Sequence, residues 1–298
     1  MISSFQRNEN AATMRSFVIM TALLAATGVG EMQGKLILDE NNISLVNLES
    51  PRNKVMLLKQ PAGLRRIGGM TRVDDHSFIF SDEKPSSFED RFIKRFDLAS
   101  GEVKTLGKGG GPMVYLPERR VLFFYRWVPD GGIDYFGRPC PDEWLVAADP
   151  ENIDGFTRIV PSSRTYELPI VQISPDEVVI YGEGERLWVY DFSDSRLKPT
   201  GIKNCWPGIW REKTKEFLCS DCGTEEIFLV NLVTGEKREV PKLKWAQGFI
   251  YIPDADAVVY AKECRDFSNL IYFYSFEKDE EIRVRGTYGG SFQGIWMP

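Results

Sequence analysis

The stretch Leu229-Val230-Asn231-Leu232-Val233-Thr234-Gly235-Glu236 decides the fold, because it is one copy of a pattern that recurs through the chain. In each copy a strand-like run ends at Asn, Asp or Ser, and an apolar residue or Pro follows. The six copies are Asn47-Leu48, Asp97-Leu98, Asp149-Pro150, Asp191-Phe192, Asn231-Leu232 and Ser275-Phe276. Their spacings are 50, 52, 42, 40 and 44 residues. This period is typical of propeller blades rather than of helical solenoids.

Each repeat predicts four strands. A hairpin tip rich in Pro and Asp, such as Ser174-Pro175-Asp176-Glu177, follows the first strand. Pro presets one backbone dihedral and Asp bonds back to its own backbone, so both favour turns. A buried apolar strand follows, as in Val178–Tyr181, and the last strand is polar and alternating, as in Glu236–Val240. Apolar inner strands with a charged outer strand are what radially stacked sheets require.

The two chain ends each supply part of one repeat. The segment Lys35–Leu38 matches the second strand of the other repeats, whereas Phe292–Pro298 matches their innermost strand. Pairing the two would remove open strand edges. We therefore predict an all-β fold, a six-bladed β-propeller closed by pairing of the C-terminal strand with the N-terminal blade. The predicted blades are 292–298 with 34–60, then 67–108, 111–162, 168–202, 206–241 and 246–289.

Residues 1–30 are predicted to be a signal peptide and 31–298 to be one propeller domain. Arg15 precedes the apolar run Ser16–Gly30, which ends in small residues and is too short to span a bilayer comfortably. We expect a periplasmic or secreted protein with no membrane span after processing. The true start is Met1 or Met14. A leader on a cytoplasmic protein is the alternative.

A family resemblance supports this reading. The turns Ser174–Glu177 and Ile252–Asp254, together with Asp97–Glu102 and Asn231–Glu236, resemble those of TolB-like and WD-repeat propellers over residues 34–298. The Gly-His and Trp-Asp pairs of true WD repeats are absent. Resemblance to TolB implies a periplasmic protein that binds partner proteins without catalysis. TolB has an additional N-terminal domain for which we expect no room here.

Propellers concentrate function on the loops at one mouth of the channel. Aromatic and Arg side chains with a polar rim are typical of protein-recognition surfaces. The candidate partner-binding residues are Trp127, Tyr135, Phe136 and Arg138 around a long insertion, and Arg164, Trp206, Trp245 and Gln247 near the channel entrance. Packing between blades is the alternative role for these Trp residues. We predict a non-catalytic protein-binding module whose partner is an envelope component or a toxin.

Two other functions stay open. A calcium-dependent lactonase or hydrolase resembling the gluconolactonase propellers would need Glu, Asn or Asp on several innermost strands. Those strands, such as Met70-Thr71-Arg72 and Gly208-Ile209-Trp210, have none in the middle, so we expect neither metal nor cofactor. A carbohydrate-binding propeller is the other alternative. A net charge of −6 argues against nucleic acid as a partner. A monomer is expected.

The five cysteines are an odd number, so one chain cannot pair them all. Export makes disulfides plausible. We expect a pairing among Cys205, Cys222 and Cys264, which the blade pattern places on one face. The run Cys219-Ser220-Asp221-Cys222 also resembles half a zinc knuckle or a redox pair, but a zinc site needs further ligands nearby.

Two other motifs have structural explanations. The single histidine, His76, follows Asp74-Asp75 at a hairpin tip, so we expect a turn residue rather than a catalyst. Four glycines flank Lys108 at positions 107 and 109–111. A phosphate-binding loop would need a helix after its lysine. Here Pro112 and another strand follow, so the glycines are expected to let the chain turn sharply between blades.

Overall fold

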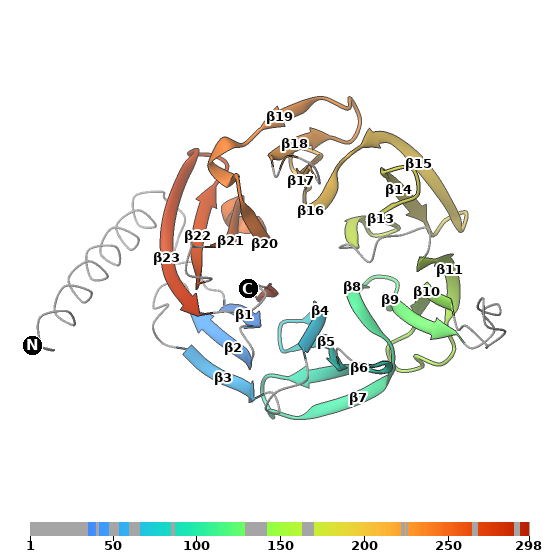
Figure 1. Ribbon diagram of the computed structural model, residues 1–298. Coiled ribbons are helices and arrows are strands. Elements are labelled where there is room, and N and C mark those ends of the chain that lie inside the picture. The colour runs from blue at the N-terminus through green and yellow to red at the C-terminus, as the bar shows by residue number, and fades with distance from the viewer. Residues whose placement is uncertain are drawn as a thin grey trace, which may run out of the picture. The chain divides into compact units, whose positions relative to one another are not determined.

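The protein was analysed as a computed structural model, which describes residues 35–39, 42–47, 54–59, 66–84, 87–128, 142–162, 170–221, 224, 226–263, 268–288 and 293–297. These residues form six four-stranded sheets in which all neighbouring strands are antiparallel (Figure 1). The chain divides into two compact units. The larger unit is Gln60–Trp245, and the smaller unit combines Ala246–Pro298 with the N-terminal part up to Lys59.

The larger unit contains four sheets, and in each the strands follow one another in chain order. The first sheet is β4 (Arg66–Asp74), β5 (Ser77–Lys84), β6 (Ser87–Asp97) and β7 (Val103–Lys108). The second is β8 (Gly110–Leu116), β9 (Val121–Val128), β10 (Asp142–Ala148) and β11 (Thr157–Pro161). The third is β12 (Val171–Ser174), β13 (Glu177–Gly182), β14 (Arg186–Asp191) and β15 (Arg196–Lys203). The fourth is β16 (Trp206–Arg211), β17 (Glu216–Ser220), β18 (Ile227–Asn231) and β19 (Lys237–Glu239), followed by the 3-10 helix η2 (Pro241–Leu243).

The smaller unit contains two sheets. One is β20 (Ala246–Ile252), β21 (Ala257–Glu263), β22 (Ser268–Ser275) and β23 (Glu280–Tyr288), with the 3-10 turn η3 (Pro253–Ala255). The other joins the C-terminal β24 (Gln293–Met297) to β1 (Lys35–Asp39), β2 (Asn42–Asn47) and β3 (Lys54–Lys59). The register pairs Ile37 with Ile295 and Leu36 with Trp296. The predicted pairing of the two chain ends in one blade is therefore confirmed.

The recurring Asp or Asn has a structural explanation. The carboxylate of Asp97 accepts the backbone N–H groups of Ala99 and Ser100 at 3.1 and 2.7 Å. The residue after it, Leu98, donates its own N–H to the carbonyl of His76 at 2.8 Å. The equivalent backbone hydrogen bond occurs in three other blades. There the N–H groups of Phe192, Leu232 and Phe276 donate to the carbonyls of Asp176, Lys215 and Asp256, respectively. In these four blades the turn after the third strand is therefore bonded to the turn after the first strand.

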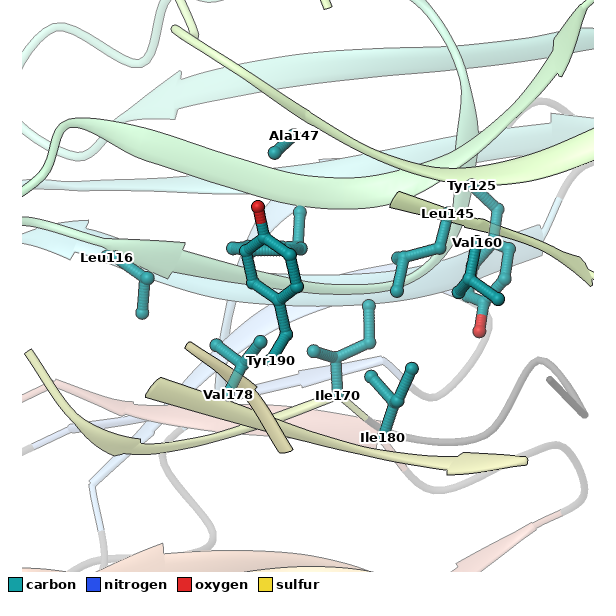
Figure 2. Packing of buried hydrophobic residues seen from close by; sticks show 10 residues of the cluster. Leu116, Tyr125, Leu145, Ala147, Val160, Ile170, Val178, Ile180 and Tyr190 are labelled. Carbon is teal, nitrogen blue, oxygen red and sulfur yellow. The ribbon is translucent and has the colours of Figure 1, made fainter. Parts of the chain in front are cut away.

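Apolar side chains fill the space between neighbouring sheets. Figure 2 shows Leu116 and Leu145 of the second sheet of the larger unit facing Val178, Ile180 and Tyr190 of the third. Leu116, Leu145 and Val178 are fully buried. Burial of each such side chain stabilises the fold by about 1.5–3 kcal/mol. The same packing joins the first sheet to the second and the third to the fourth, so the larger unit is a row of stacked blades.

The predicted all-β propeller with blades of four antiparallel strands is confirmed. Every predicted blade boundary lies within a few residues of the observed strands. Closure of all blades into one ring stays a prediction. The predicted leader, residues 1–30, lies outside the described residues. No helix in the described part of the chain has the length and apolar character needed to cross a membrane.

Candidate functional site

One edge of the larger unit contains three of the predicted recognition residues, Trp127, Trp206 and Trp245. At this edge the first strand of each sheet begins, the second ends and the third begins. We call it the loop face. The residues that lie at it include Glu83, Arg91, Trp127, Glu143, Tyr181 and Trp206.

Contacts between sheets show that these edges point the same way. The N–H of Gly111 in β8 donates to the Glu83 carboxylate at the loop face, and further along the strand Tyr115 N–H donates to the Thr71 hydroxyl of β4 at 3.0 Å. Strands β4 and β8 therefore run in the same direction. At the opposite edge Arg119, in the turn after β8, pairs with Asp176 in the turn after β12. Neighbouring blades thus share one orientation.

Two exposed tryptophans lie on the loop face of the fourth sheet. Trp206 begins β16 opposite Ser220 and is 38% exposed. Trp245 follows η2 and is 58% exposed. The N–H of Val240, just before η2, donates to the Ile227 carbonyl at 2.8 Å, and Ile227 pairs with Ser220. The end of β19 therefore lies at the same edge as Trp206. Interblade packing, the alternative role for these two residues, leaves both side chains partly exposed.

Local contacts orient both rings. The Trp206 ring lies edge-on to that of Tyr181, with centroids 6.5 Å apart. The Lys244 ammonium lies 5.8 Å from the centroid of the Trp245 ring, within the range of a cation–π interaction. Trp245 has a left-handed backbone, with φ of 68°, so its place after η2 is a specific turn conformation. Among the described residues only Met56 and Val233 are other large apolar side chains with comparable exposure.

A disulfide lies directly beside Trp206, and it corrects the predicted cysteine pairing. Cys205 is bonded to Cys219, with their Cα atoms 5.0 Å apart, so it cannot pair with Cys222 or Cys264. Cys219 is the register partner of Pro207, two residues after Cys205. Side chains two residues apart in a strand share a face, which brings the two sulfurs together in one hairpin. Cys222 and Cys264 lie outside the described residues.

Trp127 is placed differently from the prediction. The sequence predicted that it belongs to the long insertion, but it lies within β9 and its side chain is half-buried. It is the register partner of Glu143 in β10, the strand that follows the long connection. Tyr135, Phe136 and Arg138 in that connection, and Arg164, lie outside the described residues. Gln247 is exposed near the start of β20 in the smaller unit.

A buried ionic cluster lies beneath the loop face between the first two sheets, and sequence analysis did not predict it. Arg91 donates to Glu143 at 2.8 Å, and its Nε lies 3.8 Å from the Glu83 carboxylate. All three side chains are 6% exposed or less. Ser81, fully buried, donates to Glu83 at 3.1 Å. Such burial of two carboxylates requires these hydrogen bonds and the guanidinium, because isolated charges are costly to desolvate.

The glycine run forms the wall around Glu83. Gly109 and Gly111 have φ values of 142° and 74°, which confirms the predicted sharp turn between β7 and β8. Glycine is also required here because a side chain would not fit beside Glu83. A Cβ at Gly110 would lie 2.6 Å from the Glu83 carboxylate, and one at Gly68 would collide with the same group. The glycines therefore allow two backbones to approach a buried carboxylate, a role that composition alone does not reveal.

The opposite edge of the first sheet contains His76. Its N–H donates to Asp74 at 2.8 Å, so His76 is a turn residue as predicted. Ser77 and Arg95 also donate to Asp74, at 2.9 and 3.1 Å. Burial raises the pKa of Asp74, but these hydrogen bonds outweigh it and hold the pKa below the ordinary value. His76 lies at the edge opposite Trp206, so the two do not form one site.

Within the described ranges, no group of three or more His, Cys, Asp or Glu side chains is arranged to hold a metal ion. The absence of a calcium-dependent hydrolase activity stays a prediction.

Solved structures share the fold. TolB from Acinetobacter baumannii superimposes with a TM-score of 0.72 at 14% identity, over 97% of this chain and 72% of TolB. A chain of the nidogen/laminin complex gives 0.62 at 12% identity, over 89% and 98% of the two chains. A protein of unknown function from Bacteroides thetaiotaomicron gives 0.53 at 9% identity, over 90% and 86%. No family model and no curated protein matches the sequence. These likenesses identify the fold as a TolB-like β-propeller.

Proposed function

We propose that this protein is a non-catalytic recognition module that binds a protein partner through the loop face of its larger unit. The observation that carries the proposal is the pair of tryptophans, Trp206 and Trp245, exposed at the same edge of one blade. Trp side chains that a partner buries supply much of the binding energy of many protein interfaces. Both residues would lose their exposed area to the partner.

The fold supports this function by analogy. One similar structure comes from a nidogen/laminin complex, and another is TolB. A propeller provides a rigid platform, because its blades pack on one another and leave the loops free to vary. The proposed partner is a protein rather than a nucleic acid, since the chain has a net charge of −6.

The compartment we propose is the periplasm or the cell exterior. The bonded pair Cys205–Cys219 supports this assignment, because disulfides persist in oxidising compartments and are rare in the cytosol. The apolar segment after Arg15 supports it independently, as a signal for export. Protein recovered from the exported fraction of its cells and cleaved near residue 30 would test this assignment.

Site-specific photo-crosslinking tests the function. A photo-reactive phenylalanine is introduced at Trp206 in one version of the full chain and at Val233 in another. Val233 is 83% exposed and lies in the turn after β18, at the other end of the same blade. Both proteins are illuminated in extract from cells that carry the gene. We expect a defined protein adduct from the Trp206 position and none from Val233.

Affinity for the captured protein completes the test. Trp206→Ala and Trp245→Ala are each expected to weaken its Kd by about thirtyfold, the effect of losing an interface hot spot of about 2 kcal/mol. Val233→Ala should leave the Kd unchanged. Equal crosslinking from both ends of the blade, or a Kd that neither Trp substitution alters, would exclude the loop face as the binding surface.

A further inference from the structure

A covalent link lies next to one of the two proposed anchors. Cys205 directly precedes Trp206, and its disulfide to Cys219 joins the start of β16 to β17. Both cysteines are fully buried, in an apolar cluster with Ile173, Tyr181 and Phe217. The bond is therefore part of the core between two blades, whereas the Trp206 side chain beside it is partly exposed.

The backbone around Trp206 has few other restraints. Strand β16 is the edge strand of its sheet and pairs only with β17. Its ladder is irregular between Pro207 and Ile209, and Pro207 has no N–H to donate. Asn204, on the other side, has a left-handed φ of 52° and donates its N–H to the Glu185 carbonyl at 2.8 Å. The chain therefore enters β16 through a turn, and a proline interrupts the pairing immediately afterwards.

We infer that Cys205 and Cys219 are positioning residues for recognition: their disulfide fixes the start of β16 so that the Trp206 ring is preorganised for the partner. This inference rests on the proposed function. Without the bond, the two side chains still fill the same apolar space, since free cysteine behaves as a small hydrophobic residue. The fold is retained, but the start of β16 gains freedom that the partner must then remove.

The expected effect on binding is modest and measurable. Ordering one flexible side chain at an interface costs about 0.5–1.5 kcal/mol, which corresponds to about a two- to tenfold change in Kd. The double variant Cys205→Ala/Cys219→Ala should therefore bind the crosslinked partner about two- to tenfold more weakly. Replacing both cysteines avoids a new free thiol that could exchange with the remaining three.

A tryptophan-specific probe tests the positioning itself, without the partner. The full chain is labelled with 5-fluorotryptophan, and the ¹⁹F resonances of Trp206 and Trp245 are assigned from Trp206→Phe and Trp245→Phe. In the double cysteine variant the Trp206 resonance should shift and broaden. The Trp245 resonance is the internal control, because Trp245 shares the loop face but has no link to the disulfide, and it should not change.

A second route covers the case in which the double variant does not fold. The unsubstituted protein is treated with a dithiol, which donates two electrons and two protons to the Cys205–Cys219 bond and becomes a cyclic disulfide. The Trp206 resonance should respond in the same way, and reoxidation should restore it.

The outcomes separate this inference from the function. An unchanged Trp206 resonance in both the double variant and the reduced protein overturns the inference, even where Trp206→Ala abolishes binding. The opposite result is a Trp206 resonance that changes when the disulfide is removed, together with a Kd that Trp206→Ala leaves unaltered. That result overturns the proposed function, because the disulfide then positions a residue that does not contribute to binding.

Discussion

The carboxylate of Glu83, in the second strand of one blade, accepts the backbone N–H of Gly111 in the first strand of the next blade at 2.5 Å. The bond is buried and joins two sheets whose remaining contacts are largely apolar. Arg91 lies beside Glu83 and bonds to Glu143 of the second sheet. A charged cluster thus fixes how two blades meet directly below the loop face.

Removal of the central cation should destabilise the protein strongly. Arg91→Met removes the guanidinium beside the buried carboxylates of Glu83 and Glu143, for which a loss of about 3–5 kcal/mol is expected. Arg95→Met is the matched control on the same strand, because Arg95 is about one-third exposed and pairs with Asp74 and Glu151. Such surface pairs contribute at most about 1 kcal/mol. Urea unfolding at pH 7 measures the free energy of unfolding of both variants. Similar decreases in that free energy for the two variants would contradict the importance of the buried cluster.

The close packing of Gly110 against Glu83 leads to an independent prediction about stability. Gly110→Ala places a methyl group against the Glu83 carboxylate and the Arg91 side chain, so we expect a loss of about 1–3 kcal/mol, typical of overpacking. Gly201→Ala in β15 is the control, since a Cβ there meets nothing within 4 Å and its φ is not left-handed. It should be neutral or stabilise the protein by up to about 1 kcal/mol. Thermal melting of both proteins decides whether the glycines are required for close approach.

The C-terminal strand should be essential to the smaller unit. Trp296 is 9% exposed and packs among Ile250, Val259 and Phe273, so Trp296→Ala should cost about 3–5 kcal/mol. Trp245→Ala removes an exposed ring and should change the free energy of unfolding by less than about 0.5 kcal/mol. A Trp296→Ala variant as stable as Trp245→Ala would contradict the placement of β24 between β1 and the neighbouring sheet.

The repeated Asp turns predict a pH effect. The Ser193 hydroxyl, the Ser193 N–H and Lys198 bond to Asp191 and lower its pKa from the ordinary 3.8 to about 2. Because the folded pKa is below the unfolded one, its contribution to stability is complete above pH 3.8 and is lost as the pH falls through about 2. Carboxyl NMR titration should give a midpoint near 2, and Ser193→Ala should raise it while Asp97 in another blade does not change. A midpoint near 3.8 in the unsubstituted protein would refute this account of the turn.

Much of the fold could be predicted because its signals are local. Asp97 and Asn231 form turns with the residues two and three positions ahead, so the pattern is visible in a single segment. The polar hairpin tip at His76 can likewise be recognised from a short segment. The same holds for Phe292–Pro298, whose apolar pattern matches that of the other innermost strands. The repeat of 40 to 52 residues then placed each strand within a blade, including the strand that comes from the other end of the chain.

The site was harder to predict because its contacts are not local. Glu83 follows Ser81-Asp82, and such a polar run is typical of the exposed end of a strand. Its burial depends on contact with the glycine run, in which Gly111 lies 28 residues further along the chain. Burial of Cys219 opposite Pro207 depends on an irregular register that the sequence pattern does not encode. Exposure of Trp206 and Trp245 likewise depends on where β16 and η2 end relative to the sheet. Side-chain chemistry suggested these two residues, but only the structure separates them from the half-buried Trp127.

Hydrogen exchange of the full chain with and without its crosslinked partner tests the central claim most directly. Binding through the loop face predicts slower amide exchange at Trp206, at Ser220 and across Pro241–Trp245, with no change in the turn at Val233–Gly235 on the opposite edge of the same blade. Protection confined to the Val233–Gly235 turn, or absent from the Trp206 edge, would contradict the account.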